Sequence, residues 1–154
     1  MLSQTVEYAL RAMVTLAQPD QEPQTAQQIA KHTHVPLDYL SKVLRQLARA
    51  GLVSAQRGRG GGFHVARSGS QITILQIVDA VDPLKRIHTC PLGLAAHGPN
   101  LCPLHRKLDD AMRATEDAFH TTTLASISGI SVAPFCPGAS TATSTSEGAC
   151  HAIV

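Results

Sequence analysis

The sequence predicts a mainly helical protein with one small β-hairpin, arranged as a winged helix-turn-helix followed by a long dimerisation helix. Two short amphipathic segments meet at a tight turn near residue 35, and a glycine-rich turn then separates two β-type segments. A long apolar stripe after residue 103 has no remaining partner in the chain. Because only 3% of the 154 residues are aromatic, the core of this small protein must be aliphatic.

Composition and periodicity divide the chain into four regions. Residues 1–83 are expected to form the winged helix-turn-helix, residues 84–103 a loop with Cys and His ligands, and residues 104–127 the dimerisation helix. Residues 128–154 are rich in Ser, Thr, Ala, Gly and Pro, which predicts a disordered low-complexity tail. Two further cysteines lie in this tail and are interpreted as adventitious thiols: Cys136 and Cys150.

Three helices are predicted in the first fifty residues. Ser3 is placed to cap the first, and Thr25 caps the second within a capping box that ends at Gln28. The third begins at Pro36 and ends at Gly51, which supplies a left-handed stop. Their apolar residues recur at helical spacing: Val6, Leu10, Met13, Val14 and Ala17, then Ile29 and Ala30, then Leu40, Val43, Leu44 and Leu47.

The wing is predicted from residues 52–55 and 63–66, which read as short strands. Between them the turn Arg-Gly-Arg-Gly-Gly-Gly occupies residues 57–62. A nucleotide-binding P-loop is disfavoured, because this turn lacks the Lys-Ser/Thr ending and is not followed by a helix. Glycine at the tip allows close approach to a duplex, and arginine is attracted into a narrow minor groove.

Two helices are predicted after the wing. Thr73 caps the first, which ends at Asp82 and Pro83, and Pro103 suits the first position of the long helix. We expect the apolar stripe of the long helix to pack on its counterpart in a second subunit, and packing back on its own winged helix is the alternative. The stripe comprises Leu104, Leu108, Ala111, Met112, Thr115 and Phe119, and residues 124–127 are expected to add one more turn.

One-signed charge between residues 39 and 78 indicates a polyanionic partner, because this segment contains six Lys or Arg residues and no Asp or Glu. The start of the second helix of a helix-turn-helix is the part that contacts base edges. We therefore expect double-stranded DNA as the partner. The residues assigned to this contact are Thr25, Asp38, Tyr39, Ser41, Lys42 and Arg45 of the helix-turn-helix, with Arg57, Arg59, Gly60 and Gly61 of the wing.

A cluster of soft metal ligands follows the winged helix. Cys90, His97, Cys102 and His105 are spaced C-x6-H-x4-C-x2-H within sixteen residues. Thiolate and imidazole are the side chains that hold zinc and iron–sulfur centres. The loop is therefore a candidate metal site directly before the predicted dimerisation helix.

With wing and cysteine loop both present, residues 1–127 resemble the IscR/NsrR family of winged-helix transcription regulators. The resemblance rests on Glu-Tyr-Ala-Leu-Arg-Ala at residues 7–12, on the recognition-helix region at residues 38–53, and on Arg-Gly-Arg-Gly-Gly-Gly-Phe at residues 57–63. It implies a homodimer formed through a long helix, a (pseudo)palindromic DNA operator, and in many members a labile iron–sulfur cluster that senses nitric oxide, oxidants or iron status.

The resemblance also suggests individual ligands. Similar members carry three cysteines in this loop, whereas here only Cys90 and Cys102 are present, and His97 lies close to where a middle Cys is often found. His105 matches a histidine that ligates the cluster in some members. Glu7 matches an acidic residue that ligates it from the partner subunit. The missing third Cys argues against a four-iron cluster held by three thiolates.

Three outcomes remain open for this loop. A [2Fe–2S] centre is favoured, because imidazole can replace thiolate on one iron. Zinc in a tetrahedral site is the second, and a metal-free regulator that responds to thiol redox or a small molecule is the third. A zinc enzyme is disfavoured, because the sequence has no H-E-x-x-H motif and no obvious general base beside the loop.

A cytoplasmic location is expected. Glu7 and Arg11 interrupt the first apolar run, which is unlike a secretory signal, and no stretch of about 18 apolar residues predicts a membrane span.

Overall fold

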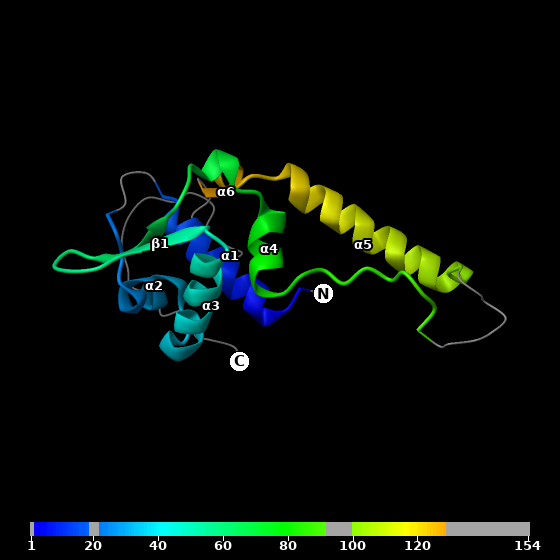
Figure 1. Ribbon diagram of the computed structural model, residues 1–154, viewed down its shortest axis with the longest axis horizontal. Helices are drawn as coiled ribbons and strands as arrows, with labels where there is room; N and C mark the ends of the chain where they lie inside the picture. The colour runs from blue at the N-terminus through cyan, green and yellow to red at the C-terminus, as the bar shows by residue number, and fades with distance from the viewer. Residues whose placement is uncertain (1, 19–21, 92–99, 129–154) are drawn as a thin grey trace, which may run out of the picture.

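A computed structural model of the chain describes residues 2–18, 22–91 and 100–128 (Figure 1). It is mainly helical with one two-stranded antiparallel hairpin, which confirms the fold class expected from the sequence. Among the described residues, no helix is both long and apolar enough to span a bilayer. The elements in chain order are α1 (Gln4–Leu16), α2 (Ala26–Thr33), α3 (Leu37–Arg49), β1 (Val53–Gln56), β2 (Gly62–Val65), the 3₁₀ turn η1 (Gly69–Gln71), α4 (Ile74–Val81), α5 (Pro103–Thr121) and α6 (Leu124–Ser128).

The predicted helix caps are confirmed. The Ser3 hydroxyl accepts from the backbone N–H of Val6, and Thr25 forms the capping box with Gln28 at the start of α2. A second capping box, between Thr73 and Gln76, begins α4. These hydroxyls satisfy backbone N–H groups that have no partner inside the helix. The start of each of these three helices is therefore determined by residues within three positions of its cap.

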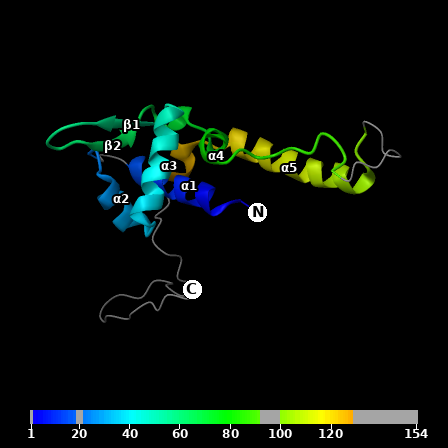
Figure 2. The same cartoon turned by 60° about the horizontal axis from the view of Figure 1, so that its bottom comes forward.

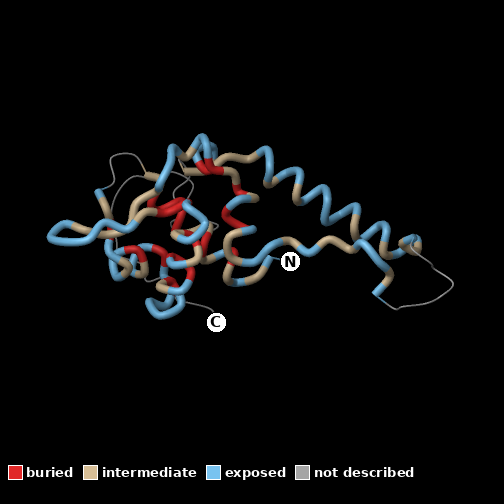
Figure 3. Tube along the Cα trace, viewed as in Figure 1, coloured by how far each residue is buried: buried red, intermediate tan, exposed pale blue. Residues whose placement is uncertain are grey.

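Helices α1 to α4 share one aliphatic core. α1 packs against α2, α3 and α4, and each of the four helices contributes fully buried side chains, among them Met13, Ile29, Leu44 and Ile77. Figure 3 shows that the buried segments are concentrated in this body, whereas α5 extends away from it. Within Pro103–Thr121, all of which the structure describes, no residue is buried. Most of the apolar stripe of α5 is therefore exposed in the single chain, while Phe119 packs partly against the body.

The hairpin also forms an isolated bridge with one residue outside it, which the sequence did not predict. Gln24, just before α2, pairs with Phe63 of β2 through two backbone hydrogen bonds of 2.9 and 2.7 Å. A Cβ on the neighbouring Gly62 would lie 2.6 Å from the backbone of Gln24. Glycine is therefore required at position 62 for this close approach, which fixes the base of the wing to the start of the helix-turn-helix.

Residues 124–127 form the extra turn expected from the sequence, as α6, and this turn is separate from the long helix α5. α5 ends at Thr121, and the extended residues after it pair with the chain before α4: the Ile74 N–H donates to the Thr122 carbonyl at 3.0 Å, and the Leu124 N–H donates to the Ile72 carbonyl at 2.8 Å. α6 then begins with Leu124, which is fully buried in the core. Residues 124–128 therefore belong to the body rather than to the projecting helix.

Residues 82–90, here called the strap, run alongside α5 from the end of α4 (Figures 1 and 2). Arg86 in the strap forms a bidentate ion pair with Asp109 of α5, with both contacts 2.7 Å long. Its third nitrogen contacts Glu116 at 3.0 Å, and the Ile87 N–H donates to Asp109 at 3.0 Å. Hydrogen bonding from Arg86 is the main cause that lowers the pKa of Asp109 to about 2.

The pKa of Asp109 predicts an acid-sensitive strap. Because its folded value of about 2 lies below its ordinary value of 3.8, its contribution to stability is fully present above about pH 4 and is lost as the pH falls to about 2. We expect the free energy of unfolding of Asp109→Asn to fall below that of the wild type at neutral pH, and this difference to shrink and disappear as the pH falls through about 2. Chemical denaturation at several pH values measures it.

Asp110→Asn is the matched control for this experiment, since Asp110 is exposed on α5 and forms no ion pair among the described residues. A pH-dependent loss of stability in Asp110→Asn equal to that in Asp109→Asn would show that the effect does not come from the strap.

Candidate metal centre and nucleic-acid interface

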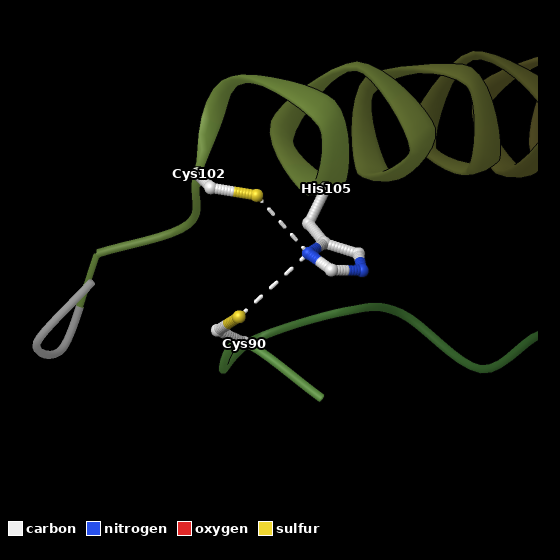
Figure 4. Close-up of side chains that lie close together, drawn as sticks. All are labelled: Cys90, Cys102 and His105. Atoms are coloured by element: carbon white, nitrogen blue, oxygen red, sulfur yellow. Dashed lines mark hydrogen bonds between the residues drawn. The ribbon is translucent and has the colours of Figure 1, made fainter. Parts of the chain in front are cut away.

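Two cysteines and a histidine converge at the start of α5 (Figure 4). Cys102 is the N-cap residue of α5, and Pro103 occupies the first helical position, as expected. His105 follows within the first turn, while Cys90 comes from the end of the strap. The His105 Nδ1 atom lies 3.2 Å from the Cys102 Sγ atom and 3.8 Å from the Cys90 Sγ atom.

The spacing of these three side chains suits a shared metal. One ligand atom from each lies within 4.8 Å of the others, and all three residues are half-buried. In a tetrahedral site with bonds of about 2.0 to 2.3 Å, ligand atoms lie roughly 3.5 to 3.8 Å apart. Thiolate and imidazole also match the ligand chemistry of iron–sulfur centres. The types of ligand present therefore fit either group, and ligand atoms this close together suit a single metal ion or one iron of a cluster.

The remaining predicted ligands do not join this group within the described chain. His97 lies outside the described residues, as do Cys136 and Cys150. Glu7 lies on α1 and forms an ion pair with Arg11 one turn later. A ligand role for Glu7 from a partner subunit needs a second chain, so it stays a prediction.

The predicted recognition helix, α3, presents a basic outer face. Lys42 and Arg45 are exposed on this face, as is the acidic Asp38, and their contact with DNA stays a prediction. The hydroxyl of Tyr39 lies 2.6 Å from Thr5 on α1, and its ring meets Tyr8 edge-on with centroids 5.4 Å apart. Tyr39 therefore also holds α3 against α1.

Ser41 and Thr25 have structural roles as well. The Ser41 hydroxyl donates to the Leu37 carbonyl at 2.8 Å, and the Ser41 carbonyl accepts from Arg45 Nε at 3.0 Å. The Thr25 hydroxyl is engaged in its capping box. A DNA contact by either hydroxyl remains a prediction and would be made in addition to, or in exchange for, these local bonds.

A basic pocket of about 410 Å³ lies between α1 and α3 and adds residues that the sequence reasoning missed. Five of its lining residues were not assigned to DNA contact: Thr5, Val43, Gln46, Arg49 and Val81. Arg49 belongs to the basic run and could have been included, whereas Thr5 gives no signal in the sequence because its position depends on how α1 packs. The polar lining consists of Thr5, Tyr39, Lys42, Arg45, Gln46 and Arg49.

The backbone conformation of the wing turn requires glycine at several positions. Gly58 and Gly60 have φ angles of +103° and +77°, a region that favours glycine. The Gly61 N–H donates to the Gly58 carbonyl at 2.9 Å, and a Cβ on Gly61 would lie 2.3 Å from the Gln56 carbonyl oxygen. This tight turn carries two exposed cations at the end of the molecule opposite to α5 (Figure 1): Arg57 and Arg59.

Comparisons with known proteins agree with this architecture. The sequence profile of the Rrf2 family, described as an iron-dependent transcriptional regulator, matches residues 2–129. A protein of Aquifex aeolicus described as an HTH-type transcriptional regulator is 30% identical over 125 residues, which cover 79% of this chain and 87% of the relative. The HTH-type transcriptional repressor NsrR of Streptomyces coelicolor is 28% identical over 123 residues, covering 77% of this chain and 79% of the repressor.

The same relationship appears in three dimensions. The solved structure of IscR from T. potens superposes with a TM-score of 0.68 at 23% sequence identity, covering 82% of this chain and 85% of that one. The IscR/NsrR-type resemblance inferred from the sequence is thereby confirmed. The chain belongs to the Rrf2 family, and it is a DNA-binding transcriptional regulator of the winged-helix type rather than an enzyme.

Proposed function

We propose that the protein is a homodimeric transcriptional regulator whose operator binding is controlled by an iron–sulfur centre, of the [2Fe–2S] type, in the Cys/His loop. The observation that carries this proposal is the convergence of Cys90, Cys102 and His105 from two segments onto the start of α5. The DNA-reading face and the ligand group belong to one chain, so a change at the ligands can reach the winged helix through the strap.

The proposed dimer is supported by the uncovered stripe of α5. Leu104 is 64% exposed and Leu108 is 45% exposed in the single chain. Beside the other half of α5 lies a crevice of about 530 Å³ whose apolar lining is Leu2, Val6, Pro83, Leu84, Met112 and Phe119. In a two-fold arrangement each subunit would place its exposed leucines in the crevice of the other, which is the self-complementary contact that such symmetry requires.

The same arrangement would account for Glu7. The crevice is lined by the first turn of α1, and Glu7 follows directly after Val6, one of the lining residues. Leu104 is adjacent in sequence to His105. Seating Leu104 of one subunit in the crevice of the other therefore brings Glu7 toward the partner's cysteines, where the family resemblance suggests a fourth ligand.

The proposed DNA contact uses two copies of α3 in successive major grooves, about 34 Å apart along a pseudo-palindromic operator. Lys42 and Arg45 would meet bases or phosphates, while Arg57 and Arg59 of the wing would enter the adjacent minor groove. Basic side chains around the α1–α3 pocket would neutralise backbone phosphates, which makes binding strongly dependent on salt.

The ligands of the centre are connected to the DNA-binding body by two segments, so the centre could control operator binding. The strap leads from α4 of the DNA-binding body to Cys90, and α5 leads from Cys102 and His105 back to the body at Leu124. An iron–sulfur centre would supply a redox-active, chemically labile group that fastens Cys90 to α5. When the ligands are no longer held together, the end of the strap at Cys90 would lose one of its attachments to α5, which would alter the relation between α4 and the dimer helix.

A [2Fe–2S] centre is favoured among the iron–sulfur types, because imidazole can replace thiolate on one of its irons. Two thiolates, an imidazole and a carboxylate from the partner would complete its four ligands. The same three side chains would also hold zinc with one position left for a fourth ligand. A metal-free regulator that senses thiol redox or a small molecule is the remaining alternative.

Replacing Arg59 by Ala removes a wing cation, and we expect the affinity for DNA upstream of the protein's own gene to fall by about 1 to 3 kcal/mol, or roughly 5- to 150-fold. Fluorescence anisotropy at fixed salt measures this loss. Arg113→Ala, on α5 and far from the wing along the chain, is the control. Equal affinities for wild type and Arg59→Ala would remove the wing from the interface.

Placing a charge on the α5 stripe tests the dimer. Leu108→Asp is expected to convert a dimer into a monomer, because the carboxylate would be buried against apolar surface. Size-exclusion chromatography with light scattering reports the mass. Ala114→Asp adds the same charge outside the stripe and should remain dimeric. A wild-type protein that is monomeric at micromolar concentration would contradict the proposed assembly.

Anaerobic purification tests the centre itself. We expect iron and acid-labile sulfide in equal amounts with visible absorption, and we expect Cys102→Ser to lose both because it removes a ligand at the start of α5. Cys150→Ser, in the tail, should retain them. Stoichiometric zinc without a visible band would establish the zinc alternative, and neither metal would establish the metal-free one.

A further inference from the structure

We propose that Arg86 is a positioning residue for the metal centre, which holds Cys90 at the other two ligands by fastening the strap to α5. The inference rests on the ligand set proposed above and goes beyond it, because Arg86 is not itself a ligand. It assigns a function to an ion-pair group that neither the DNA interface nor the dimer stripe uses.

The three ligands are held in different ways. Cys102 and His105 both belong to the start of α5, three residues apart, so the helix itself keeps them together. Cys90 comes from the strap, which is not part of any helix or strand. Its sulfur stays 3.8 Å from His105 Nδ1 only while the strap remains against α5 (Figure 4). The position of the strap therefore determines whether the site has three ligands or two.

Arg86 makes the polar attachment of the strap to α5. Asp109 receives two hydrogen bonds from the guanidinium and one from the Ile87 N–H, and Glu116 receives another from Arg86. The side chains of Arg86 and Asp109 are only 22% and 16% exposed. A bidentate pair between half-buried groups is geometrically more restrictive than an exposed contact of two long side chains.

The attachment lies close to the ligands along both segments. Arg86 precedes Cys90 by four residues, and Asp109 follows His105 by four residues, which is about one helical turn. At the other end of the strap, Leu84 packs against the aliphatic core. Removing Arg86 would therefore leave the strap anchored near α4, while nearer to Cys90 the bond from the Ile87 N–H to Asp109 would lose the guanidinium that orients its carboxylate. It would also leave two carboxylates, Asp109 and Glu116, facing the strap without a cation from Arg86.

The test is binding of Co²⁺ to the full-length protein, prepared metal-free and reduced. Each thiolate that binds Co²⁺ adds to a sulfur-to-cobalt charge-transfer band, so the intensity of the band counts the cysteines at the metal. We expect Arg86→Gln to lower the affinity for Co²⁺ by about 10- to 100-fold, as removal of an outer partner of metal ligands does. We also expect the band at saturation to fall from the intensity of two thiolates to that of one.

Two further variants separate positioning from general damage. Arg86→Lys retains the positive charge but cannot form the two parallel hydrogen bonds of a guanidinium. Compared with Arg86→Gln, it should therefore regain part of the affinity for Co²⁺ and part of the signal from the second thiolate. Asp109→Asn should reproduce the defect of Arg86→Gln, whereas Asp110→Asn and Arg113→Gln, exposed and without ion pairs among the described residues, should bind like the wild type. Far-UV circular dichroism checks that each variant is folded.

The outcomes are distinct. If wild-type protein gives no thiolate band with Co²⁺, the ligand set itself is wrong and the proposed function loses its centre. If the wild type shows two thiolates and the folded Arg86→Gln and Asp109→Asn variants show two with unchanged affinity, the centre stands and the positioning role of Arg86 is overturned.

Discussion

The attachment of α5 to the body is the constraint on which the rest of the molecule depends. No residue of this helix is buried, so packing alone does not orient it within the single chain. Its direction is set at one end by backbone pairing of Thr122 and Leu124 with the chain around Ile72, and along its side by Arg86 and Asp109. Both attachments lead to α4, so the helix that carries the exposed leucines is tied to the DNA-binding body at two places.

The wing shows how one set of residues can satisfy both conformation and charge. Its glycines are demanded by the turn, since positive φ angles at two of them and close backbone contacts at Gly61 and Gly62 exclude a side chain. The side chains of Arg57 and Arg59 add charge at this turn. The glycines of the tip therefore indicate a tight hairpin and not, by themselves, a DNA contact. The exposed cations of the hairpin are what suit it to a nucleic acid.

Features that depend on neighbours three or four residues away were predictable from the sequence. The caps at Ser3, Thr25 and Thr73 and the helix stop at Gly51 are of this kind. The pairing of Gln24 with Phe63 and the break after α5 were not, because both join segments that are distant in the chain. The role of Arg86 was missed for the same reason: its partners lie 23 and 30 residues away and have no local signature.

The candidate metal site depends partly on residues that are close in the sequence and partly on a contact between distant segments. Pro103 after Cys102 predicts a helix start that presents Cys102 and His105 together, whereas the approach of Cys90 depends on the strap. A site with one ligand on a separate segment couples its occupancy to the position of that segment. Because such coupling is reciprocal, any DNA or subunit contact that moves the strap must alter metal affinity as much as the metal alters that contact.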